Sequence, residues 1–117
     1  MIADCLIFIV ALLHAGFMVL EIALWTKAPG RRIFRMSAEQ AKATAVLASN
    51  QGLYNGFLAA GLVWSLIYPD PHFAGQIATF FLLCVIAAGV YGAISVNKRI
   101  FFVQAFPAIL ALIPLYI

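Results

Sequence analysis

Two ionisable side chains stand inside an otherwise apolar stretch near the start of the chain. His14 and Glu21 are seven residues apart in the run "LLHAGFMVLEIALW". In an α-helix this spacing places both side chains on one face, about 10 Å apart along the axis. An acid and an imidazole are residue types that serve acid–base catalysis or proton-coupled binding. If the stretch crosses a membrane, the acid must face the protein interior, be protonated or find a partner.

A second polar group lies in "ASNQGLYNGFLAAG", residues 48–61. On a helix its amide and phenol side chains span about 140° of the surface. The depth of each side chain in the membrane can be estimated at about 1.5 Å per residue from the basic loops that separate the four expected helices, which are described below. By this estimate, each of the four helices has a polar side chain in one layer near Glu21. The predicted ligand-binding residues are therefore Glu21, His14, Asn50, Gln51, Tyr54, Asn55, Gln104 and Tyr91.

The composition predicts an integral membrane protein. Of 117 residues, 66% are hydrophobic and 9% are charged, whereas a soluble domain is roughly 45–50% apolar and about 25% charged. Runs such as "FFLLCVIAAGV" do not alternate in polarity, which excludes a β-barrel and favours helices. We expect an all-α, up-down four-helix bundle that forms a single transmembrane domain over residues 1–117. Its spans are about 2–25, 42–68, 73–95 and 99–117.

The basic residues predict the orientation. Five basic residues flank the first expected loop: Lys27, Arg31, Arg32, Arg35 and Lys42. Lys98 and Arg99 form the third loop, whereas the second, "YPDPHFAG", has no basic residue. The positive-inside rule puts these two loops in the cytoplasm and both termini outside. Membrane lipids are the expected partners, and we attribute any binding of anionic lipid by the first loop mainly to topology. No nucleic-acid partner is expected, because the bases do not form one surface.

Local signals refine the expected helices. "KAPG" is expected to end the first helix in a turn, because Pro29 and Gly30 break helices. "RRIFRM" then forms a short amphipathic piece at the membrane surface. "SAEQ" is a capping box that begins the next helix near residue 38, and Pro107 should kink the last helix. Stripes of small residues, Gly52 and Gly56 among them, should let helices approach closely.

No metal site or cofactor is expected. Cys5 and Cys84 lie at different predicted depths, so a disulfide is not expected. The sequence has no Cys/His cluster with metal-ligand spacing, and no phosphate-binding loop or haem signature.

The stretches "LLHAGFMVLEIALW", "GRRIF" and "LASNQGLYNGFLAAGLVW" resemble a family of small bacterial membrane proteins known as domain of unknown function 1304. The resemblance covers nearly the whole chain. It implies a four-helix integral membrane protein and carries no assigned activity.

Three functions remain open. In the first, Glu21 is the proton- or cation-responsive group of a pocket that binds or transports a small molecule or lipid, most simply in a homodimer. In the second, His14 and Glu21 are the catalytic acid–base pair of a membrane-embedded enzyme, such as an isomerase. In the third, the small-residue stripes bind another membrane protein, and the amides tie helices together through bonds of about 0.6 kcal/mol each. The combination of acid, imidazole and amides favours the first.

Overall fold

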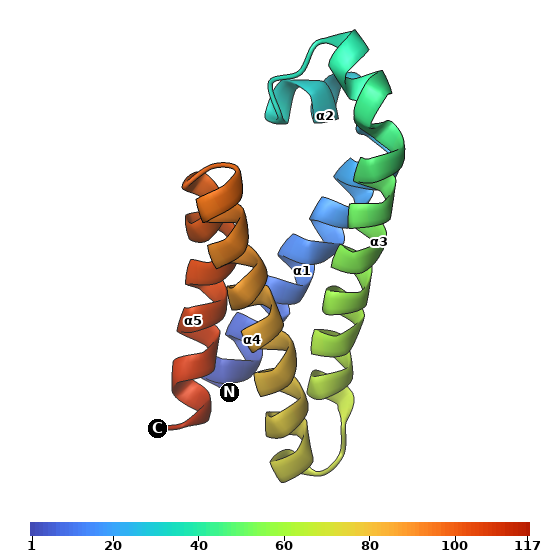
Figure 1. Ribbon diagram of the computed structural model, residues 1–117. Coiled ribbons are helices and arrows are strands. Elements are labelled where there is room, and N and C mark those ends of the chain that lie inside the picture. Colours follow the sequence, from blue (N-terminus) through green and yellow to red (C-terminus); the bar gives the residue numbers. More distant parts are fainter. The chain divides into compact units, whose positions relative to one another are not determined.

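The computed structural model describes residues 1–117 and contains helices but no strands, so the all-α prediction is confirmed. The elements along the chain (Figure 1) are α1 (Ile2–Ile22), α2 (Ala28–Ile33), α3 (Ala38–Ile67), α4 (Pro71–Ser95), the π-helical turn η1 (Phe101–Ala105), α5 (Phe106–Leu112) and the 3₁₀ turn η2 (Ile113–Leu115).

Polar side chains cap the beginnings of α3 and α4. The Ser37 backbone N–H donates to Gln40 Oε1 at 3.0 Å, and the Gln40 N–H donates to Ser37 Oγ at 3.1 Å. These reciprocal bonds form the predicted capping box, and α3 begins at Ala38 as expected. Asp70 caps α4 by accepting from the His72 N–H at 2.8 Å, and Pro71 follows at a position where its missing N–H costs nothing.

Two boundaries differ from the predictions. α1 ends at Ile22, three residues before the expected end of the first span, where the Leu24 N–H reaches back to the Val19 carbonyl at 3.2 Å. Pro29 and Gly30 do not form a turn but lie in the first turn of α2. Proline is tolerated there because the first helical N–H groups have no partner inside the helix.

Pro107 does interrupt the last helix, in the form of a π-turn. It is the second residue of α5, the helix that directly follows η1. A proline inside a regular helix removes one hydrogen bond and its ring collides with the carbonyl four residues earlier. A wider π-turn at that point relieves the collision. The fourth expected span is therefore a π–α–3₁₀ sequence rather than one regular helix.

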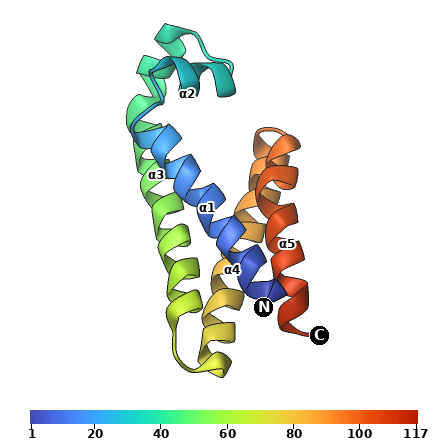
Figure 2. The same ribbon diagram turned by 180° about the vertical axis from the view of Figure 1, so that it is seen from behind.

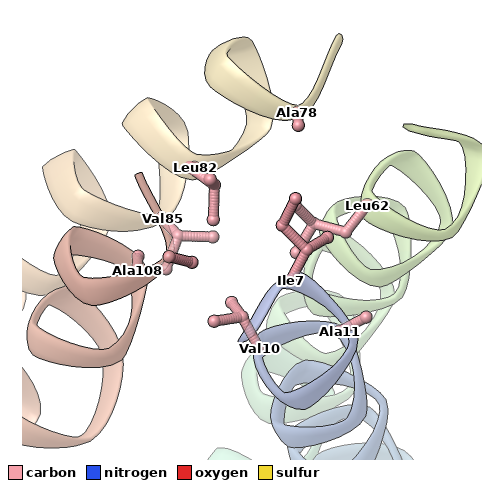
Figure 3. Close-up of a cluster of buried hydrophobic side chains, with 9 residues drawn as sticks. Ile7, Val10, Ala11, Leu62, Ala78, Leu82, Val85 and Ala108 are labelled. Atoms are coloured by element: carbon pink, nitrogen blue, oxygen red, sulfur yellow. The ribbon is translucent and has the colours of Figure 1, made fainter. Parts of the chain in front are cut away.

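The chain divides into two compact units, residues 1–12 with 58–117, and residues 13–57. In the first unit α4 packs along η1 and α5 (Figure 1). Buried side chains from four helices meet in one cluster (Figure 3), which consists of Ile7, Val10, Ala11, Leu62, Ala78, Leu82, Val85, Ala108 and Ala111. Small residues bring backbones close there, since a Cβ at Gly89 would lie 2.6 Å from the Ala105 nitrogen.

The second unit is a helical hairpin. The last turns of α1 run beside the middle turns of α3, and α2 lies in the connection between the two helices, near the start of α3 (Figures 1 and 2). Direct contacts support this pairing: a Cβ at Gly52 would lie 2.8 Å from Ile22 Cγ1, and Trp25 Nε1 donates to Thr44 Oγ1 at 2.9 Å.

Two helices are long and apolar enough to cross a membrane, judged by length and composition. They are α1 and α4. The helical run Phe101–Leu115 is apolar but shorter. α3 is longer than both, with 30 residues, and carries the amide residues of the "ASNQGLYNGFLAAG" stretch in its middle.

Candidate functional site

The predicted polar residues of α1 and α3 meet at one hydrogen bond. Asn55 Nδ2 donates to Glu21 Oε1 at 2.5 Å. Asn55 is buried, with 9% of its surface exposed, and Glu21 is half-buried. A carboxyl group has room for about four hydrogen bonds, so this one leaves capacity for a further donor.

Glycines on α3 allow the two helices to approach closely enough for this bond. A Cβ on Gly52 would lie 3.0 Å from Glu21 Cβ and 3.2 Å from the Met18 carbonyl oxygen, and one on Gly56 would lie 2.7 Å from Met18 Sδ. Asn55 stands between these glycines in the sequence, one turn beyond Gly52. The stripe of small residues therefore sets the distance at which the amide meets the acid.

Trp25 closes the same hairpin beyond the end of α1. Its indole N–H donates to Thr44 Oγ1, whose hydroxyl donates to the Gln40 carbonyl at 2.8 Å. The other side of the indole meets the Phe34 ring at 4.8 Å between centroids. Trp25 thus links Phe34, which follows α2, to the first turns of α3.

His14 lies on α1 seven residues before Glu21, and its side chain is fully buried. Its ring meets the edge of Phe17, with 5.2 Å between centroids and 74° between planes. Since both residues belong to one regular helix, their backbones are about 10 Å apart along its axis. Direct proton exchange between the two side chains would need a bridging group.

The remaining predicted residues of α3 lie on its outer surface. Asn50, Gln51 and Tyr54 are exposed, the last by 52%, and none of them shares the Glu21–Asn55 bond. An open, shallow hollow of about 520 Å³ lies beside them, lined by Ile22, Ala45, Val46, Ser49, Asn50 and Leu53. Glu21 does not line this hollow.

Tyr91 and Gln104 belong to the other unit. Tyr91 is 75% exposed near the end of α4, and its carbonyl accepts a bond of 2.7 Å from the Ser95 hydroxyl. Gln104 is half-buried in η1, next to Ala105, which packs against Gly89. No group of three or more His, Cys, Asp or Glu side chains is placed to hold a metal ion.

Sequence reasoning missed two positions that shape this site. Thr44 was not among the predicted residues, yet its hydroxyl accepts the hydrogen bond of the Trp25 indole. Gly30 was expected in a turn, yet it is buried in α2, and a Cβ there would overlap the Leu24 carbonyl oxygen. In the sequence, the only sign of this close packing was that residue 30 is a glycine. The structure gives the reason, because α2 packs so closely on the preceding loop that no side chain fits there.

The fold and site describe an all-α protein with two membrane-compatible helices and a carboxyl–amide pair between two helices. The chain belongs to the family described as "Protein of unknown function (DUF1304)", whose profile matches residues 8–116. The resemblance seen in the sequence is thereby confirmed. A relative, "Uncharacterized protein YpaA" of Lactococcus lactis subsp. lactis (strain IL1403), is 33% identical over 107 residues, which cover 90% of this chain and 88% of the relative. No solved structure matches the chain.

Proposed function

We propose that the chain is a four-span protein of the bacterial inner membrane, with α1, α3, α4 and the run Phe101–Leu115 as its spans. The buried cluster in which four helices meet supports a bundle. α3 has about 45 Å of helix, enough to cross the lipid core and extend beyond it. The basic residues gather around α2 and in the turn before η1. By the positive-inside rule this distribution supports a topology with these two connections in the cytoplasm and both termini outside.

Cysteine labelling tests this topology. In a variant whose two native cysteines are replaced, single cysteines are placed at Lys98 and at His72 and treated with a membrane-impermeant maleimide on intact cells stripped of their outer membrane. Labelling at position 72 and protection at position 98 are expected. The reverse pattern contradicts the orientation, and labelling at both contradicts the pairing of spans.

We propose further that Glu21 and Asn55 form the polar centre of a binding or transport site for a small molecule or lipid headgroup that bears a positive charge. The observation that carries this proposal is the 2.5 Å bond between the Glu21 carboxyl group and the buried Asn55 amide, in helices that the proposed topology makes membrane spans. An acid inside a span is costly and marks functional sites more often than structural ones. Asn55 orients the carboxyl group, which retains acceptor capacity for a ligand. A transport path through so small a chain would be completed by a second copy.

The competing explanation is that the pair only ties α1 to α3. Glu21→Gln separates the two, because a glutamine carbonyl oxygen can still accept the Asn55 hydrogen while the acid is lost. A purely structural pair therefore tolerates this substitution, whereas a cation- or proton-responsive site does not.

The experiment uses wild type and Glu21→Gln in proteoliposomes with an imposed pH gradient, and tetraphenylphosphonium as the lipophilic cation. Wild type should take up the probe, and Glu21→Gln should lose uptake at an unchanged melting temperature in detergent. Asn50→Ala, on the exposed surface of the same helix, is the matched control and should keep most of the uptake. Equal uptake by wild type and Glu21→Gln, or none by either, contradicts the proposal.

A further inference from the structure

A basic and apolar surface surrounds α2. Between Glu21 and Glu39 the chain has no acidic residue. The same interval holds four cations, and two apolar side chains stand among them with 58% and 40% of their surface exposed, Ile33 and Phe34. We call Lys27, Arg31, Arg32, Ile33, Phe34 and Arg35 the α2 surface.

This surface is held in place rather than carried on a loose loop. Gly30 is buried so closely that a Cβ would lie 2.8 Å from Trp25 Cα. Phe34 packs on the Trp25 ring, and Trp25 is bonded to Thr44 on α3. α2 is therefore packed on the loop that follows α1, and Trp25 joins that loop to α3.

The end of α2 is also defined. The Met36 N–H donates to the Arg31 carbonyl at 2.9 Å, closing the helix end. Arg35 occupies the intervening position with φ of 53°, a left-handed conformation that costs a non-glycine residue about 1 kcal/mol or more. Arginine occupies a position where glycine is the usual residue, and it adds a cation to the α2 surface.

Arg31 lacks a protein acceptor for part of its guanidinium group. Its side chain is half-buried, and its Nε atom is enclosed without a hydrogen-bond partner. Buried guanidinium nitrogens are normally hydrogen-bonded, and a phosphate is an acceptor that matches the planar arginine fork.

We propose that the α2 surface binds the phosphate groups of anionic lipids in the inner leaflet. Exposed Ile33 and Phe34 would enter the level between headgroups and acyl chains, and the cations around them would meet lipid phosphates, as in amphipathic interfacial segments. Charge complementarity selects an anionic lipid surface as the occupant, because four cations and two exposed apolar side chains lie between residues 27 and 35 and no acidic residue lies among them. This inference rests on the proposed orientation of the spans but not on a ligand at Glu21.

Quenching of Trp25 by brominated lipids tests the proposal. The full chain carrying Trp64→Phe, so that Trp25 is the only tryptophan, is reconstituted into vesicles of phosphatidylcholine and phosphatidylglycerol in equal parts. In one sample the phosphatidylglycerol is brominated and in the other the phosphatidylcholine. In the wild-type sequence at these positions, we expect brominated phosphatidylglycerol to quench Trp25 more strongly than brominated phosphatidylcholine. The ratio of the two quenching strengths should fall about fivefold in Arg32→Gln, and about fivefold again in Arg31→Gln/Arg32→Gln.

The control is Lys98→Gln/Arg99→Gln, which removes the same charge from the other basic connection. It should leave the preference at Trp25 unchanged. Equal quenching by the two lipids in wild type, or the same loss of preference in the control as in the α2 variants, overturns the proposal and leaves these cations with only a topological role.

The Trp25 emission maximum reports whether each variant keeps the hairpin. If the double variant does not fold, the single variant Arg32→Gln, at an exposed position, tests the proposal. Cysteine labelling tests the orientation of the spans separately, and tetraphenylphosphonium uptake tests the Glu21 site. A failure of the α2 proposal can therefore be told apart from a failure of either proposed function.

Discussion

Asn55 donates its hydrogen bond to Glu21 from a position one helical turn beyond Gly52, the glycine that touches the Glu21 side chain. The polar contact and the close backbone approach are therefore parts of one arrangement. The Asn55 amide can satisfy the Glu21 acid here because no side chain at Gly52 holds the helices apart.

The first prediction concerns the strength of the Glu21–Asn55 bond. In a double-mutant cycle with Glu21→Ala and Asn55→Ala, we expect a coupling of about 0.6 to 1.7 kcal/mol, the range of hydrogen bonds between membrane helices. Unfolding in mixed detergent micelles measures it. The cycle of Glu21→Ala with Asn50→Ala should show no coupling, since Asn50 does not share the bond. Equal coupling in both cycles would mean that the effect belongs to α3 as a whole.

The second prediction concerns Gly52. Gly52→Ala places a methyl group 2.8 Å from Ile22 Cγ1 and 3.2 Å from a backbone oxygen, so the helices must separate, at a cost of about 1–3 kcal/mol. Thermal unfolding in detergent measures the loss. Gly16→Ala, on α1 with nothing within 4 Å of the added carbon, should instead stabilise by up to about 1 kcal/mol through helix propensity. Stabilisation by both substitutions would contradict the close packing at Gly52.

The third prediction concerns the bond from Trp25 to Thr44. Trp25→Phe retains a ring against Phe34 but loses the indole donor, so we expect a loss of about 0.5–1.5 kcal/mol. Thr44→Val should cost a similar amount, and combining both should add little, because either change removes the same bond. Chemical denaturation in detergent provides these values. Additive losses would show that Trp25 and Thr44 act independently.

The fourth prediction concerns the contact between α4 and η1. Gly89→Ala adds a methyl group 2.6 Å from the Ala105 backbone nitrogen, and a backbone atom cannot rotate away. We expect a loss of about 1–3 kcal/mol and faster amide hydrogen exchange in η1. Gly75→Ala, on the same helix with open space around it, is the matched control and should not accelerate exchange in η1. If Gly89→Ala leaves exchange there unchanged, the packing of η1 on α4 is not as described.

Several structural features followed from local sequence. The capping box at Ser37 predicted the start of α3 because its two hydrogen bonds join residues three apart. Pro107 predicted an irregularity in the last helix, although not that it would be a π-turn. The placement of Pro29 in a turn was wrong, because proline is also well tolerated in the first turn of a helix, and local sequence does not distinguish the two.

The candidate site was only partly predictable. The spacing of His14 and Glu21 and the cluster of amides around Asn55 marked the polar residues. The sequence did not indicate that Asn55, rather than its neighbours Asn50 and Gln51, would meet the acid. Successive side chains on α3 point about 100° apart around the helix axis. Which of them faces Glu21 depends on how the whole helix is turned, and the glycines that contact α1 decide that orientation.

The sequence by itself determined the all-α class, the family, the start of α3 and the identity of the acid, because composition, caps and motifs are local properties of the chain. Only the tertiary structure decided that Asn55 is the partner of Glu21, that Trp25 bonds to Thr44, and that Gly30 fixes α2 against the preceding loop. These contacts join residues 34 and 19 positions apart in the first two cases. They arise from how closely and at what rotation the helices pack, which no local pattern specifies.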